Sequence, residues 1–333
     1  MPAILIDISH ESKAYLSEIA ESVDMVRLET TENSLIQEIR NVEILNNHYF
    51  IRHGVYSEIL MFDLNGQFVK KVGAIGRGPG EYSGTSQILV DNESGRLLLN
   101  SYGIMIFDHN GVFVEHIVLD KNGSSANSML IHNKHLYCFY NAGEWFYSGE
   151  RESSTFLAAY NTTDWKLTDS IFFKSYIGNY LFPAYLTQSN QNIYLYSKIP
   201  ESPETKSDVD TLYVVKDKRA VPYLTAQVVG KGENGGYVDR VVMTDNYGII
   251  THSISVKDDK EPWPISVLSQ YYFNLRTMRG KNATNGFIDD FYSGNNVIIT
   301  PIPNTNKFYY YITDYSNLEA VPNPILYVGT FKK

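Results

Sequence analysis

One hairpin motif recurs along this sequence and strongly constrains its fold. Residues 62–69 are Phe-Asp-Leu-Asn-Gly-Gln-Phe-Val, and residues 107–114, 45 positions later, are Phe-Asp-His-Asn-Gly-Val-Phe-Val. An Asn-Gly pair between two apolar runs is a strong signal for a β-hairpin, with a type I′ turn in which both central residues have positive φ. The sequence therefore predicts repeated antiparallel hairpins.

Four further segments place turn residues between two apolar runs, which gives six hairpins in all. They lie at 160–165, 215–218, 273–276 and 312–317. Successive hairpins are separated by about 40 to 58 residues, a period expected of β-propellers. Six hairpins at this spacing predict six blades.

The segment from 35 to 72 indicates what one blade contains. Turn residues at Asn46 and Asn47 help to divide it into four strand candidates, at 35–45, 49–51, 59–62 and 68–72. Four antiparallel strands in about 35 residues is the size of one propeller blade. The inner strands of the later blades are expected at 87–90 with 97–100, 128–131 with 135–140, 186 with 193–196, 238–243 with 248–251, and 287–291 with 296–300.

These patterns predict an all-β fold: a six-bladed β-propeller of four-stranded antiparallel blades, in a single domain spanning residues 1–333. Residues 1–40 form an N-terminal segment with a short helix at 12–20, and residues 41–333 form the blades. A terminal strand should complete the last blade and close the ring, because closure removes free sheet edges. Val23–Leu28 and Ile325–Thr330 are both candidates for this strand, and the two alternatives stay open.

Composition excludes several classes of function. The net charge is −9 and there is no long basic run, so nucleic acid is not expected as a partner. No apolar run approaches the roughly 20 residues of a transmembrane helix. The single cysteine, Cys138, lies in an apolar stretch and is expected to be a buried, inert thiol.

A glycine-rich loop at 76–82, Gly-Arg-Gly-Pro-Gly-Glu-Tyr, provides the best candidates for ligand contact. It is not a phosphate-binding loop, because no Gly-Lys-Ser/Thr and no helical pattern follow it. Three glycines and a proline are typical of a sharp crossing between blades, so we favour an architectural role. Arg77, Glu81 and Tyr82 are nevertheless the candidate ligand-binding residues. Backbone chemistry alone does not require the charged side chains of Arg77 and Glu81, and Tyr82 could supply an aromatic platform.

No other pattern predicts a catalytic residue, a metal site or a cofactor. Two histidine pairs lack a third ligand at a suitable spacing, and two aspartate pairs would point to opposite faces of a strand. They are His48 with His53, His132 with His135, Asp258 with Asp259, and Asp289 with Asp290. No Gly-x-Ser-x-Gly motif is present. Aromatic groups at 145–147, 271–273 and 308–311 could stack on sugars, but packing between blades is favoured.

Four stretches together carry a resemblance to a known family: residues 27–36 (Arg-Leu-Glu-Thr-Thr-Glu-Asn-Ser-Leu-Ile), the hairpin beginning at Phe62, the loop 76–82, and Asn323–Leu326. The chain resembles the six-bladed β-propeller proteins common in Bacteroidetes, which are related to NHL-repeat propellers. This resemblance implies an exported protein, periplasmic or at the cell surface, with a lipid anchor on its full-length precursor. Members mostly lack an assigned activity, so it implies no catalytic residue.

The function predicted from these observations is a non-catalytic binding or interaction propeller of the cell envelope. A small molecule, a glycan or a protein would bind at one mouth of the central channel, where propeller loops converge, and the protein would be a monomer. One alternative is a propeller enzyme of the lyase or lactonase type with an axial site, and another is a partner-docking module. The printed chain has no signal peptide before Ile4, as in a cytoplasmic protein or an exported protein whose signal has been removed.

Overall fold

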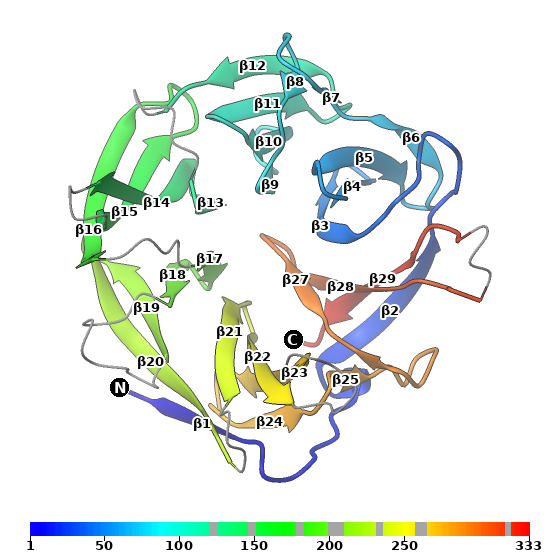
Figure 1. The fold of residues 1–333 in the computed structure, drawn as a ribbon, viewed down its shortest axis with the longest axis vertical. Helices are drawn as coiled ribbons and strands as arrows, with labels where there is room; N and C mark the ends of the chain where they lie inside the picture. Colours follow the sequence, from blue (N-terminus) through cyan, green and yellow to red (C-terminus); the bar gives the residue numbers. More distant parts are fainter. Residues whose placement is uncertain are drawn as a thin grey trace.

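The structure is a computed structural model that describes residues 1–119, 126–145, 151–177, 183–198, 210–230, 236–256, 265–316 and 321–333. Its main strands form six antiparallel sheets of four strands, and one sheet gains a fifth strand. The sheets surround a central axis as the blades of a β-propeller (Figure 1). The predicted fold class is confirmed. A membrane-spanning helix is absent from the described residues.

We name the blades A to F in chain order. Blade A contains β3 (Ile39–Leu45), β4 (His48–His53), β5 (Glu58–Asp63) and β6 (Phe68–Lys71). Blade B contains β9 (Ile88–Asp91), β10 (Arg96–Asn100), β11 (Ile104–Asp108) and β12 (Phe113–Ile117), and blade C contains β13 (Ser128–His132), β14 (His135–Trp145), β15 (Arg151–Asn161) and β16 (Leu167–Ile177). Blade D contains β17 (Ala184–Ser189), β18 (Asn192–Ser197), β19 (Asp210–Lys216) and β20 (Arg219–Val229), and blade E contains β21 (Gly236–Met243), β22 (Tyr247–Val256), β23 (Ile265–Asn274) and β24 (Gly280–Ala283). Blade F contains β27 (Thr300–Ile302), β28 (Lys307–Ile312), β29 (Ile325–Phe331) and β2 (Ala20–Arg27).

The hydrophobic core is divided among the six interfaces between neighbouring blades. Successive residues of a strand point to opposite faces of its sheet, so each blade contributes to two interfaces. In β28, Phe308 and Tyr310 pack into the interface with blade E, whereas Tyr309 packs into the interface with blade A. Likewise Tyr272 and Phe273 face different interfaces. The aromatic groups at 271–273 and 308–311 therefore pack between blades, as predicted. The side chains of the third group, at 145–147, lie outside the described residues.

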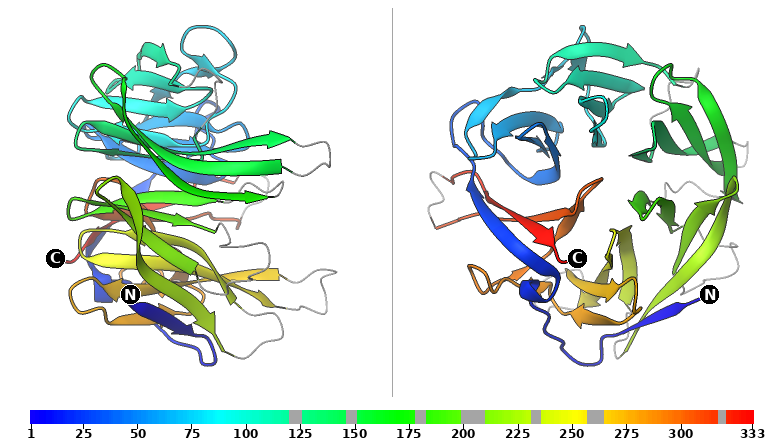
Figure 2. Two further views of the ribbon diagram at one scale, coloured as in Figure 1. Left: turned by 90° about the vertical axis from the view of Figure 1, so that its left-hand side faces the viewer. Right: turned by 180° about the vertical axis from the view of Figure 1, so that it is seen from behind.

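The N-terminal segment closes the ring and ties three blades together. Strand β2 pairs antiparallel with β29, so Val23–Arg27 of the candidate Val23–Leu28 lies in the outer strand of blade F, and Ile325–Thr330 lies in its neighbour. The short strand β1 (Ala3–Asp7) was not predicted, and it pairs parallel with β20 as a fifth strand of blade D. Between them the segment passes blade E on the outside of the ring (Figure 2), where the Ile288 N–H donates to the Ala14 carbonyl at 2.8 Å.

The innermost strand of each blade is a sheet edge, and polar side chains join these edges across most interfaces. An edge strand has backbone N–H and C=O groups without a partner strand, and a side chain from the next blade can supply their hydrogen bonds. The bonds run from Asn41 to Ile88, Gln87 to Met129, Ser128 to Leu186, and Thr187 to Met243. Gln270, on the third strand of blade E, bonds to Ile299, which directly precedes the innermost strand of blade F. The inner strands are thereby held around the axis.

The predicted turn type at Asn65–Gly66 is wrong. Only Gly66 has positive φ, at 84°, and its N–H donates to the Asp63 carbonyl at 3.0 Å, as in a type I turn followed by a left-handed glycine. The Asp63 carboxylate also accepts from Asn65 N and Gln67 N, each at 2.9 Å, which favours this longer loop. Both central residues have positive φ in other two-residue loops, at 46–47, 133–134, 190–191 and 217–218.

Two further predictions fail in and before the last blade. Residues 287–291 and 296–300 were predicted as its inner strands, but they hold a separate hairpin of β25 (Phe287–Ile288) and β26 (Asn296–Val297). The other five predicted hairpins join the third and fourth strands of their blades. The segment 312–317 instead follows the second strand of blade F, because the N-terminal strand β2 supplies the fourth strand of that blade. The predicted helix at 12–20 is confined to α1 (Leu16–Ile19).

Candidate functional site at the channel mouth

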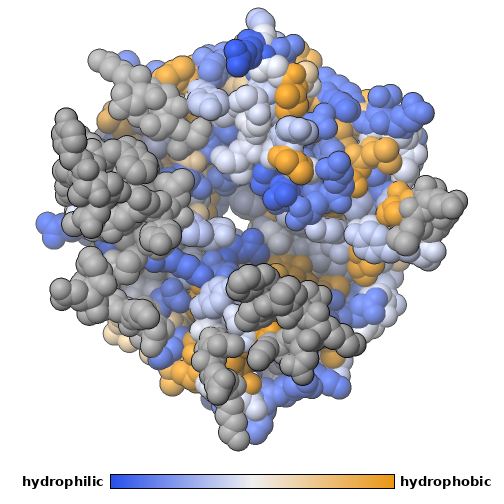
Figure 3. All heavy atoms as spheres, viewed as in Figure 1, coloured by the Kyte–Doolittle hydropathy of each residue, from blue (hydrophilic) through white to orange (hydrophobic). Residues whose placement is uncertain are grey.

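A polar depression of about 560 Å³ lies at one end of the central axis, and we call it the vestibule. It is lined by the turns that join the first and second strands of five blades. The polar lining residues are Asp91, Asn92 and Glu93 of blade B, His132, Asn133 and Lys134 of blade C, Gln188, Asn190 and Gln191 of blade D, Asp245 of blade E, and Asn304 of blade F. Figure 3 shows the opposite end of the channel, where hydrophilic side chains also surround a hollow at the axis.

Tight turns bring the lining residues of blades C and D to the mouth. Asn133 and Lys134 have φ of 49° and 58°, and Asn190 and Gln191 have φ of 47° and 70°. Asparagine adopts this left-handed conformation more readily than most residues, because its short polar side chain bonds locally. Each pair therefore forms a two-residue loop that projects polar side chains from the end of a rigid hairpin.

Hydrogen bonds join the vestibule walls between neighbouring blades. His132 Nδ1 lies 2.6 Å from Gln188 Oε1, and His132 Nε2 lies 2.9 Å from Asn133 Nδ2. These partners fit a neutral imidazole that donates from Nδ1 and accepts at Nε2. Asn190 Nδ2 donates to the Asp245 carbonyl at 2.8 Å, which joins blade D to blade E. The wall between blades C and E is thus already ordered.

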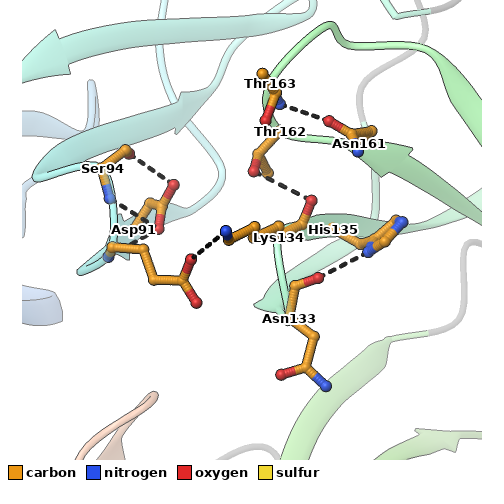
Figure 4. A network of polar contacts seen from close by, with 9 residues as sticks. Asp91, Ser94, Asn133, Lys134, His135, Asn161, Thr162 and Thr163 are labelled. Carbon is orange, nitrogen blue, oxygen red and sulfur yellow. Dashed lines mark hydrogen bonds and ion pairs between the residues drawn. The ribbon is translucent and has the colours of Figure 1, made fainter.

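At the rim of the vestibule, a polar network fixes the turns of blades B and C (Figure 4). The Asp91 carboxylate accepts from Ser94 Oγ at 2.6 Å and from Glu93 N at 3.1 Å, so it serves its own turn. The Lys134 carbonyl accepts from Thr162 N at 2.9 Å. The Lys134 ammonium lies 3.8 Å from the Glu93 carboxylate, but both side chains are more than 60% exposed. Such a pair contributes at most about 1 kcal/mol, so the lysine can leave it for a ligand.

A second cavity of about 180 Å³ adjoins the vestibule, and we call it the inner chamber. Its apolar lining residues are Leu130, Leu186, Val242, Met243, Pro301, Ile302 and Pro303. Gln188, Asp245 and Asn304 line both cavities.

Asn304 lies at the boundary between the vestibule and the inner chamber. Its φ is 58°, and its Nδ2 donates at 3.2 Å to the carbonyl of Ile131, which belongs to the blade on the other side of the ring (Figure 1). Its Oδ1 is buried and has no hydrogen-bond partner among the described residues.

The three residues predicted from the glycine-rich loop lie elsewhere, at the outer rim between blades A and B. The loop pairs β7 (Ala74–Ile75) with β8 (Glu81–Tyr82), and Figure 1 places this pair outside β11. Tyr82 is only 3% exposed and donates to the Val72 carbonyl at 3.2 Å, and burial raises its pKa. Glu81 Oε2 accepts from Arg77 N at 2.9 Å and from Gly78 N at 2.7 Å.

The same loop borders a shallow hollow of about 590 Å³, together with residues of blade B such as Phe113 and His116. The exposed Arg77 and Glu81 side chains therefore lie beside a surface depression, although not beside the channel. A role of Arg77, Glu81 and Tyr82 in ligand binding stays a prediction.

The remaining candidates have structural surroundings. Asp289 accepts from the backbone N–H groups of Phe291, Tyr292 and Ser293, and Asp290 accepts from Ser17 N at 3.0 Å. Within the described residues, no three His, Cys, Asp or Glu side chains gather in a way that could hold a metal ion. Asp258 and Asp259 lie outside the described residues. Cys138 is buried, and burial raises its pKa to about 12, so it is the inert thiol that was predicted.

Sequence reasoning placed a site at a channel mouth but proposed none of the vestibule's lining residues for ligand binding, and it considered His132 only as one of a rejected pair of metal ligands. One signal could have found some of them. The turns at 46–47, 133–134 and 190–191 each contain asparagine and occupy the same position in their blades. Superposing the blades in sequence would have aligned these turns and shown polar residues converging at one end of the ring.

Comparisons with known proteins agree with the fold. The sequence matches the family described as "Domain of unknown function (DUF4934)" over residues 3–324. No functionally curated protein matches it. A Bacteroides fragilis protein, described as presumed to be exported, aligns over 99% of this chain and 100% of its own, with 14% identity and a TM-score of 0.64. A DUF4221-family protein of Bacteroides vulgatus aligns over 97% and 99%, with 10% identity and a TM-score of 0.54. At such identities the likeness concerns the fold alone.

Proposed function

The chain belongs to the DUF4934 family, and from that premise we propose that it is a non-catalytic binding propeller whose ligand or partner occupies the vestibule. The observation that carries this proposal is the convergence of turns from five blades on one polar depression of about 560 Å³. Loops that a rigid scaffold holds together at a concave surface are a common location of binding sites.

The chemistry of the lining supports reversible binding. Amide side chains predominate, and each offers both a donor and an acceptor. The bonds between His132 and Gln188 and between Asn190 and Asp245 order the walls before a ligand arrives. Less side-chain entropy is then lost on binding.

We place this function in the cell envelope, with an exported chain that is periplasmic or at the cell surface. Two observations support the location: the resemblance to Bacteroidetes propellers, which extends to NHL-repeat relatives, and the description of the similar Bacteroides fragilis protein. A lipid anchor on the full-length precursor and a monomeric state belong to the same proposal.

The test is a binding screen with the full chain against a glycan array and a peptide library, followed by calorimetry on each hit. A double variant, Gln188→Ala with Asp245→Asn, removes vestibule groups, and Gln67→Ala on an exposed rim turn is the matched control. We expect the double variant to bind at least about tenfold more weakly, the effect of roughly 1.4 kcal/mol, and the control to bind normally.

Two results would contradict the vestibule proposal. Ligands that bind the double variant as tightly as the wild type, but do not bind Arg77→Ala, would place the site at the outer loop. A wild-type chain that binds nothing in either screen would remove the basis for a binding function.

A further inference from the structure

The vestibule and the inner chamber are adjoining parts of one channel. They share Gln188, Asp245 and Asn304, so a ligand in the polar vestibule would meet the apolar chamber directly. The chamber, about 180 Å³ in volume, has room for one aliphatic side chain. Leu, Val, Ile, Met and Pro make up half of its lining residues, and the other half are polar. An apolar group that enters it leaves water, which provides the main favourable free energy.

Asn304 adds a directional requirement where the two cavities meet. Its bond to the Ile131 carbonyl fixes the amide orientation, because the flipped amide would place two oxygens in contact. Oδ1 is then a buried acceptor without a partner in the described part of the chain. A buried acceptor is costly unless a donor reaches it, and a ligand N–H can replace water in that role.

The required ligand therefore has an N–H donor immediately beside an apolar group. In a peptide both are attached to one Cα, since the backbone N–H lies next to the side chain. The vestibule side chains Asn133, Gln188 and Gln191 match the donors and acceptors of further backbone amides. A sugar fits less well, because the described residues that line the two cavities include no Phe, Tyr or Trp face for stacking.

We infer that the channel recognises a peptide segment of a partner protein, with one aliphatic side chain in the inner chamber and its backbone N–H on Asn304 Oδ1. This inference rests on the proposed function and names the class of its ligand. Glu93 and Asp245 outnumber Lys134 in the vestibule, so neutral or basic neighbours of the aliphatic residue are favoured over acidic ones.

The experiment enriches a display library of random heptapeptides on the full chain and then measures Kd for acetylated, amidated synthetic hits. Val242→Phe fills the chamber, and we expect it to weaken binding by about 10- to 100-fold. Asn304→Gly keeps the left-handed backbone but removes the acceptor, and we expect a loss of about three- to tenfold. Asn46→Gly is the matched control, since Asn46 is left-handed too but lies outside both linings, and it should bind normally.

A second arm does not depend on the folding of any variant. Each hit is resynthesised with its aliphatic residue changed to Ala or Asp, and wild-type protein should bind both forms at least about tenfold more weakly. One result would overturn the role of the inner chamber while keeping the vestibule as the site. In that case neither the changes in the peptide nor Val242→Phe would raise the Kd, but the double variant Gln188→Ala with Asp245→Asn would not bind the peptide. Binding of glycans alone would overturn the peptide class. Binding of neither probe would overturn this inference together with the proposed function.

Discussion

Glu43 is a carboxyl group in the interior of blade A. It lies on the innermost strand opposite Phe50, is 1% exposed, and receives a hydrogen bond from Asn41 Nδ2 at 3.3 Å. Burial raises its pKa well above 4.5, and the bond from Asn41 lowers it by less. The protonated form is therefore the one that the fold accommodates.

The first prediction follows from that pKa. With the folded-state pKa above the unfolded value, the stability associated with Glu43 is fully present below about pH 4.5 and is lost as the pH rises towards the folded-state pKa. Glu43→Gln stays neutral, so its free energy of unfolding relative to wild type should grow by up to about 1.4 kcal/mol per pH unit in that window. Urea denaturation from pH 4 to 8 measures it, with exposed Glu32→Gln as the control. A difference that does not change with pH would contradict the burial argument.

The second prediction concerns the glycine-rich loop, in which Gly80 has a positive φ. Its φ is 78°, and an added Cβ would lie 3.0 Å from the Cβ of Phe113. Gly95 has a similar φ of 66°, but nothing lies within 4 Å of its added Cβ. Gly95→Ala should cost about 1 kcal/mol from backbone strain alone, and Gly80→Ala should cost more, about 2–3 kcal/mol. If chemical denaturation shows that the two variants lose equal free energy of unfolding, the Phe113 side chain moves aside at little cost.

Individual strands were largely predictable, because most are short apolar runs that turn residues separate. Details of the turns were not, since Asn65–Gly66 adopts its conformation partly through the Asp63 carboxylate, which the dipeptide signal ignores. Strand β1 also escaped prediction. Its pairing with β20 joins residues more than 200 positions apart, and no local pattern carries that information.

The third prediction tests the side-chain bonds between blades E and F. Gln270 is fully buried, and its side-chain amide bonds both Ile299 N, at 2.9 Å, and Ile299 O, at 2.8 Å. Gln270→Met keeps the length but leaves two buried backbone groups unpaired, so we expect a loss of about 2–5 kcal/mol. Gln67→Met on the surface should change stability by less than about 0.5 kcal/mol. Similar urea midpoints for the two variants would mean that the interface re-forms without these bonds.

The fourth prediction separates scaffold from site in the loop 76–82. Glu81→Ala removes the acceptor for Arg77 N and Gly78 N, so we expect a loss of about 1–2 kcal/mol. Arg77→Ala removes an exposed side chain and should leave the melting temperature unchanged. If Arg77→Ala abolishes binding of glycans or peptides at unchanged stability, the outer loop is a site after all.

At the scale of the whole molecule, the ring and its blade number were predictable because the hairpins recur at a regular interval. The members of the candidate site were not. Ile131 and Asn304 are 173 residues apart in the chain, and they meet only because the ring closes. The residues of a propeller pocket come together only when the ring closes, so a search for motifs of neighbouring residues in the sequence cannot identify them as one site.

The fifth prediction concerns closure. Deleting residues 1–30 removes β1, α1 and β2, which frees the edge of β29 and uncovers apolar surface around Phe308 and Phe331. Free edges promote association, so the truncated chain should aggregate or elute as oligomers in size-exclusion chromatography. Deleting residues 1–9 removes only β1, and this chain should stay monomeric with a lower melting temperature. A monomeric 1–30 deletion with wild-type stability would exclude the closure role.

The joint between β2 and β29 also has a consequence in time. Strand β2 is synthesised about 300 residues before its partner β29. At roughly 5–20 residues per second, this delay is on the order of 15–60 s. Throughout that interval β2 has no partner, and joining such distant segments carries a large entropic cost and slows folding. The nascent chain therefore depends on whatever shields β2 until β29 is made.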